Sequence, residues 1–80
     1  MAESIFDTLR QLGATVDVRR VDGDGGLALV GPTGSRVAVE VYHDARSWAA
    51  NLDSEAGGHA RLDAAQPDTV AALVRGMGAL

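Results

Sequence analysis

The chain has 80 residues, which suffices for one domain with a small core and leaves no room for a second core. It contains no cysteine, which excludes a disulfide framework and thiolate metal ligands. Its formal net charge is −4 and all seven basic residues are arginine, a balance that argues against nonspecific nucleic-acid binding through phosphate neutralisation.

The first segment has the periodicity of an amphipathic helix. Its apolar stripe comprises Ile5, Phe6, Leu9 and Leu12, which follow one another at helical spacing. We expect Ser4 to cap the start of this helix, because its hydroxyl can accept a hydrogen bond from a free backbone N–H. Gly13 should end it, because glycine adopts the left-handed conformation without steric cost.

The next part of the chain alternates with a period of two, which predicts strands. The expected strands are 14–19, followed by a bulge at 20–21, then 27–30 and 36–42. The connecting segments 22–26 and 31–35 are rich in glycine and predict tight turns. Because these connections are short, the three strands should pair as antiparallel neighbours.

The third expected strand has the clearest pattern of the chain. Val37, Val39 and Val41 share one face, which we expect to be buried. Ala38, Glu40 and Tyr42 share the opposite face.

The segment 44–53 fits two structures. Trp48, Ala50 and Leu52 alternate with polar residues, which predicts a strand with Trp48 in the core. The alanine content instead favours a short helix at 44–52, capped by Asp44. We expect the strand and keep the helix as the alternative.

The last third of the chain predicts one more strand and a second helix. Residues 59–64 alternate modestly, and Pro67 interrupts the pattern. Asp68 is expected to cap the helix that follows. The apolar stripe of this helix comprises Val70, Leu73, Val74 and Met77.

Together these elements predict a single α+β domain over residues 1–80, with an antiparallel meander of about five strands and a helix at each end (α-β-β-β-β-β-α). The alternative has three or four strands and the short helix at 44–52. Both helices should pack on one face of the sheet, because each has one apolar stripe to bury. The opposite face, which carries Glu40 and Tyr42, should remain open.

No segment carries a catalytic, cofactor or metal motif. The loop 22–26 lacks the later ligands of a calcium-binding EF-hand, and 31–35 lacks the lysine and the following helix of a phosphate loop. His43 and His59 offer an acid–base or metal site with a nearby carboxylate, but neither has a second histidine four residues away. We therefore expect no enzyme activity, no cofactor and no metal.

The arginines and the aromatic residues indicate which surface could bind a partner. Five arginines fall in or near the expected strands, where we expect them to pair with aspartates across strands rather than to contact RNA. Tyr42 lies opposite the valine face, and tyrosine is enriched at binding surfaces. The expected partner-binding residues are Glu40, Tyr42, His43 and Arg46.

We therefore expect a small noncatalytic protein-interaction domain that binds another protein or a second copy of itself, since large apolar residues are few and the core is thin. The alternative is a dimeric nucleic-acid-associated regulator that concentrates arginine on one face. The absence of lysine and the abundance of alanine and glycine indicate a GC-rich genome, so we expect an actinobacterial or phage accessory, immunity or chaperone-type protein. We also expect a cytoplasmic location and no membrane contact, since no signal-peptide pattern or apolar span occurs.

Overall fold

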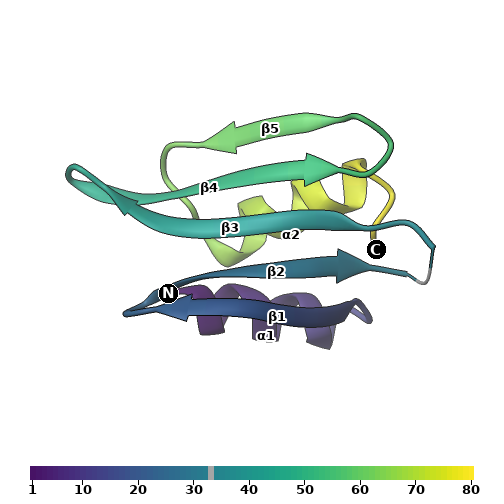
Figure 1. Ribbon diagram of the computed structural model, residues 1–80, viewed down its shortest axis with the longest axis horizontal. Coiled ribbons are helices and arrows are strands. Elements are labelled where there is room, and N and C mark those ends of the chain that lie inside the picture. The colour runs from purple at the N-terminus through teal and green to yellow at the C-terminus, as the bar shows by residue number, and fades with distance from the viewer. Residues whose placement is uncertain (33) are drawn as a thin grey trace.

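A computed structural model describes residues 1–32 and 34–80. The elements follow in the order α1 (Ala2–Gln11), β1 (Thr15–Asp22), β2 (Gly25–Gly31), β3 (Val37–Asp44), β4 (Ser47–Ser54), β5 (His59–Leu62) and α2 (Pro67–Gly76) (Figure 1). Thr33, which belongs to the expected turn at 31–35, lies outside the described residues. The predicted α+β order is thus confirmed.

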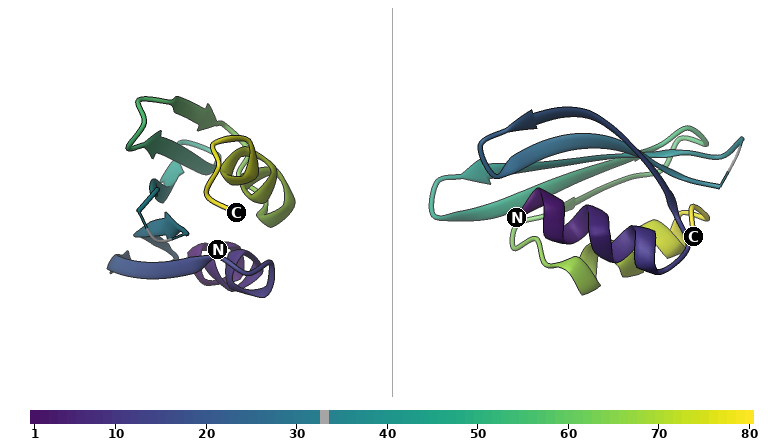
Figure 2. Two further views of the ribbon diagram at one scale, coloured as in Figure 1. Left: turned by 90° about the vertical axis from the view of Figure 1, so that its right-hand side faces the viewer. Right: turned by 90° about the horizontal axis from the view of Figure 1, so that it is seen from below.

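The five strands form one antiparallel sheet in which each strand pairs with its neighbour in sequence, in the order β1-β2-β3-β4-β5. Both helices lie on the same face, and the sheet curves around them (Figure 2). α1 packs against β1, β2 and α2, while α2 also contacts β4. The other face of the sheet, which we call the open face, carries no helix (Figure 1). Neither helix in the described part of the chain is long and apolar enough to cross a bilayer.

The core lies between the sheet and the helices. Val37, Val39 and Val41 are each at most 2% exposed, which confirms that the valine face of β3 points inward. The other fully covered large side chains come from every layer of the fold: Ile5 and Leu9 from α1, Val30 from β2, Leu52 from β4, and Val70 and Val74 from α2. Burial of these apolar surfaces is the main force that holds the helices on the sheet.

The segment 44–52 does not form a helix, so that alternative is wrong. β4 pairs with β3 along its whole length, from Asp44 opposite Ser47 to Val37 opposite Ser54. Two adjacent alanines, Ala49 and Ala50, are fully buried and point to opposite faces of the sheet. Tertiary pairing therefore overrides the weak helical preference of alanine.

Both helices begin earlier than the sequence suggests, and neither Ser4 nor Asp68 is the N-cap residue. α1 starts with Met1 as its N-cap, and the Ser4 carbonyl accepts a hydrogen bond from the Thr8 hydroxyl. α2 starts with Gln66 as its N-cap; the Gln66 N–H donates to the Thr69 hydroxyl, and the Asp68 carboxylate accepts a hydrogen bond from the Thr69 N–H. Pro67 occupies the first turn, where its missing N–H costs nothing.

β1 is longer and less covered than expected. It continues to Asp22, and its register against β2 shifts between Val18 and Arg20, so the bulge lies at Arg19 rather than at 20–21. Val18 is 38% exposed although it lies on the helix side of the sheet. Leu12, which belongs to the expected stripe of α1, is 48% exposed. The edge of the fold formed by α1 and β1 is therefore less well covered than its centre.

Candidate functional site

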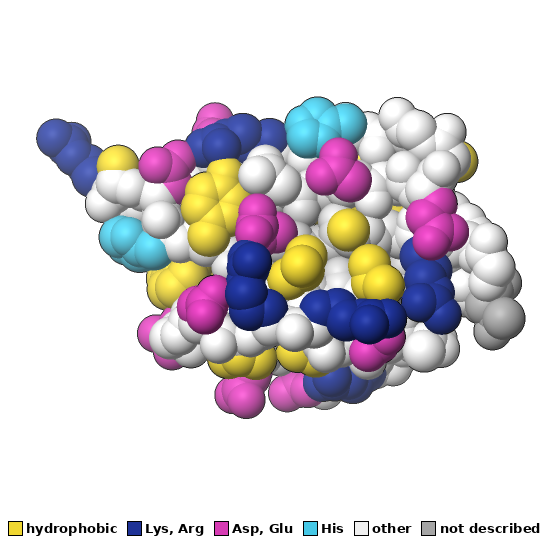
Figure 3. Space-filling model, in the orientation of Figure 1, with side chains coloured by type: hydrophobic (Ala, Val, Ile, Leu, Met, Phe, Trp, Pro, Cys, Tyr) yellow, Lys and Arg dark blue, Asp and Glu magenta, His cyan; other side chains and the backbone are white. Residues whose placement is uncertain are grey.

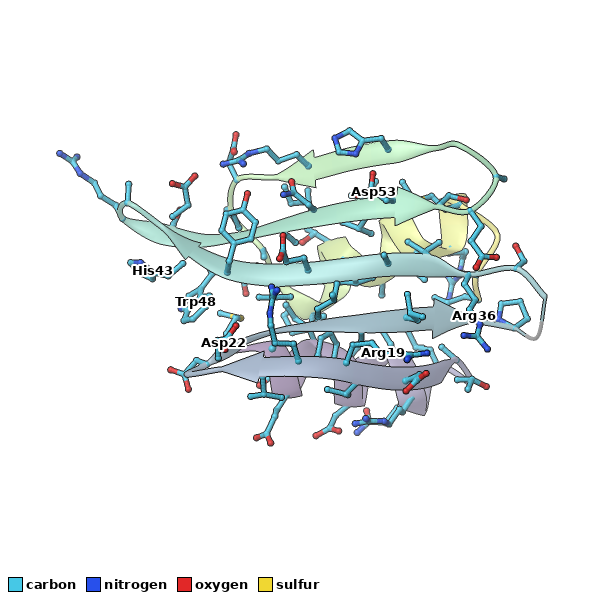
Figure 4. All side chains as sticks on the ribbon, in the orientation of Figure 1. Arg19, Asp22, Arg36, His43, Trp48 and Asp53 are labelled. Atoms are coloured by element: carbon cyan, nitrogen blue, oxygen red, sulfur yellow. The ribbon has the colours of Figure 1, made fainter. Side chains whose placement is uncertain are left out.

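The open face combines a short apolar strip with charged borders. Leu27 and Leu29 of β2 and Ala38 of β3 are half-buried and lie next to one another in the sheet register. Figure 3 shows such hydrophobic side chains between a row of arginines and several carboxylates. Arg19 and Arg36 belong to the arginine side, and Asp53 lies across the strip (Figure 4).

Most of these charges are bonded within the chain. Arg20 of β1 bonds Asp22 at 2.9 Å and reaches Glu40 of β3 at 2.5 Å, passing over Leu27 of the intervening strand. Arg19 bonds Asp17 at 2.8 Å. The expected pairing with aspartates across strands is not what these two arginines form, because Asp17 and Asp22 belong to β1 itself and the cross-strand partner of Arg20 is a glutamate. Their charge is nevertheless largely balanced locally.

A second network centres on Arg61 of β5. Its guanidinium bonds Asp63 at 2.8 Å and Asp44 at 2.5 Å, donates to the Tyr42 hydroxyl, and lies 5.7 Å from the centroid of the Tyr42 ring. The hydrogen bonds to Asp63 and Asp44 raise the pKa of Arg61 above its ordinary value. Arg61 thus holds the Tyr42 side chain in place as a permanent cation.

The four expected partner-binding residues do not form one site. Glu40 and Tyr42 lie on the open face, where each is engaged by an arginine. His43 lies on the helix side of the sheet and packs edge-on against Trp48, with ring centroids 5.3 Å apart (Figure 4). Arg46 lies in the turn between β3 and β4 and is exposed. Trp48 itself is half-buried against the core.

The two histidines are separated. His43 lies opposite Trp48 near the start of β4, whereas His59 lies opposite Asp53 near its end. The two positions are five residue steps apart along β4, which corresponds to roughly 17 Å. His59 Nδ1 lies 2.6 Å from Asp53 Oδ1, an exposed pair. Within residues 1–32 and 34–80, no three His, Asp or Glu side chains cluster as metal ligands would.

A second surface, which the sequence pattern did not indicate, lies between α1 and the β1–β2 hairpin. A hollow of about 440 Å³ there, which we call the α1–β1 groove, is lined by Met1, Ala2, Glu3, Phe6, Asp7, Arg10, Val18, Val21, Gly23, Asp24 and Gly25. Val21 is 59% exposed, and Phe6 is 2% exposed at the floor. A volume of this size is typical of sites that hold a small ligand or an anchoring side chain.

One glycine and one backbone hydrogen bond hold α1 in place beside the groove. A Cβ on Gly26 would lie 2.8 Å from the Arg20 carbonyl oxygen and 3.4 Å from the Phe6 ring, so glycine lets α1 approach β2 closely. The start of α1 is tied to the hairpin by a 2.7 Å hydrogen bond from the Ala2 N–H to the Asp24 carbonyl. Because the helix is held against β2, it covers β1 only in part. Val18 and Val21 of this edge strand therefore remain exposed.

The alternation of β1 predicts inward-facing valines, and they do face the helix side. What the sequence does not reveal is that β1 is an edge strand that α1 covers only in part. The chain matches no protein-family model, no curated protein and no solved structure.

Proposed function

We propose that this chain is a small noncatalytic protein-interaction domain that receives its partner at the α1–β1 groove. One observation carries the proposal. In the described part of the chain, the exposed large hydrophobic residues are Leu12, Val18 and Val21, and all three lie on or beside α1 and β1. Two of them line the groove. Apolar side chains gathered in a hollow at an edge strand are a common feature of protein-binding surfaces.

The open face supports the proposal less well. Its leucines are only half-exposed, and its charged side chains already bond to one another. Exposed ion pairs of this kind stabilise a complex weakly unless a partner removes them from water. Glu40 and Tyr42 therefore remain a secondary expectation, as the border of a larger interface. Accessory, immunity and chaperone-type proteins are classes of this size that act by binding other proteins.

Replacing Val18 and Val21 together by threonine should reduce partner binding at least about tenfold, since each substitution places a hydroxyl in the contact without changing side-chain shape. Immobilised wild-type chain and the double variant would be compared by quantitative capture from an extract of the source organism. An Ala56→Ser variant in the exposed β4–β5 turn is the control and should behave as wild type. Equal recovery of the same proteins by the double variant, at unchanged Tm, would contradict the proposal.

The alternative function, a dimeric nucleic-acid-associated regulator, has one feature in its favour: the arginine row on the open face (Figure 3). Because Arg19 and Arg20 are bonded to carboxylates and the net charge is −4, we expect no retardation of DNA or RNA in a low-salt mobility-shift assay. Retardation that weakens steeply as salt is added would favour the regulator instead.

A further inference from the structure

We infer that the partner segment bound in the α1–β1 groove is a cationic peptide that places an apolar side chain against Phe6, Val18 and Val21. This inference rests on the proposed function and specifies the chemistry of its partner. It follows from the floor of the groove, the charges on its rim and the edge strand beside it.

The floor selects an apolar side chain. Phe6 lines the hollow and is only 2% exposed, while Val18 and Val21 are 38% and 59% exposed. An inserted leucine or valine would remove both its own surface and part of these valines from water, which stabilises the complex by about 1.5–3 kcal/mol for a fully buried side chain. A polar side chain would gain nothing from these walls.

The rim selects positive charge. Three carboxylates line the groove, those of Glu3, Asp7 and Asp24, against one cationic side chain, Arg10, and the α-amino group of Met1. Arg10 bonds Asp7 at 2.8 Å, so these two charges balance each other. Within residues 1–32 and 34–80, Glu3 and Asp24 form no ion pair. Glu3 and Asp24 thus have no ion-pair partner among the described residues, and the carboxylates outnumber the cationic groups at the rim, so arginine or lysine of a partner would complement it.

The edge strand favours an extended segment. β1 pairs with β2 on one side, and no described strand pairs with it on the other. An unpaired edge accepts an added strand, in which every second side chain points to the same face of the sheet. The bulge at Arg19 limits continuous pairing, so side chains in the groove, rather than a long ladder, must provide much of the affinity.

Three labelled eight-residue peptides test the inference by fluorescence anisotropy: alternating arginine and leucine, alternating glutamate and leucine, and alternating arginine and serine. We expect the arginine–leucine peptide to bind at least about tenfold more tightly than either of the others. The Glu3→Gln, Asp24→Asn double variant should weaken this binding roughly 2- to 30-fold, as expected for the loss of two exposed charge pairs. Its matched control, Glu55→Gln with Asp68→Asn, removes two exposed carboxylates outside the groove and should leave binding unchanged.

The outcomes separate the inference from the proposed function. Equal binding of the glutamate–leucine peptide, or equal weakening by the control variant, would overturn the charge preference. Absence of any peptide binding would overturn the inference, while capture of a protein by wild type but not by the Val18→Thr, Val21→Thr variant would leave the proposed function standing. If no peptide bound, and wild type and the Val18→Thr, Val21→Thr variant captured the same proteins equally, both the inference and the proposed function would be rejected.

Discussion

Replacing Leu52 with alanine should lower the free energy of unfolding by about 2–5 kcal/mol. The Leu52 side chain is completely buried on the helix side of β4, where it lies between Val39 of β3 and Ala60 of β5 in the sheet register. Truncation leaves a cavity that is not easily closed, because β3 and β4 are each paired on both sides. In a domain of this size, the loss should lower Tm by at least about 8 °C in a thermal melt followed by circular dichroism.

Leu29→Ala is the matched control. Leu29 has the same side chain on a neighbouring strand but lies on the open face and is half-buried, so the same truncation should cost only about 1 kcal/mol. A loss at Leu29 equal to that at Leu52 would mean that something covers the open face as fully as the helices cover the other. That result would redirect the search for the interface to the open face.

The second large effect is expected at Gly31, the last residue of β2. Alanine there would place its Cβ 2.2 Å from the Ser35 carbonyl oxygen, in a backbone with φ of +154°. The contacting atom belongs to the backbone, and Ala79 lies 3.3 Å away on the other side, so neither neighbour can move without disturbing the chain around it. We expect a loss of about 2–4 kcal/mol, measured by urea denaturation.

Gly58→Ala provides the comparison for Gly31. Its Cβ would meet only the Ser54 Cβ, at an ordinary 3.5 Å, and its φ is not positive. The free energy of unfolding should therefore change by no more than about 0.5 kcal/mol. If Gly31→Ala were tolerated equally well, the close approach of the segment around Ser35 to β2 would be wrong.

Much of the fold follows from local pattern. The strict alternation of Val37, Val39 and Val41 could belong only to a strand with one buried face, and short glycine-rich connections leave adjacent antiparallel strands as the simplest arrangement. The terminal helices are likewise visible in their apolar stripes. These features depend on neighbours within a few residues, which is why the sequence suffices to predict them.

The features that the sequence left open or did not predict depend on residues far apart. Whether 44–52 is helix or strand is decided by pairing with β3, and the use of Gln66 rather than Asp68 as a cap is decided by where the chain enters α2. The exposure of Val18 and Val21 depends on how far α1 reaches across an edge strand. The candidate groove was therefore missed, although each of its residues is visible in the sequence.

The packing of α1 against α2 joins the two ends of the described chain across the helix side of the sheet. The hairpins of the meander can pair in succession as they are synthesised, because every partner is close in sequence. Residues 67–76 are made after all five strands, and until they leave the ribosome the inner surface of β4 and one side of α1 remain exposed to water. During this interval the nascent domain exposes apolar surface of an incomplete core. Chaperone binding and misassembly can then compete with folding.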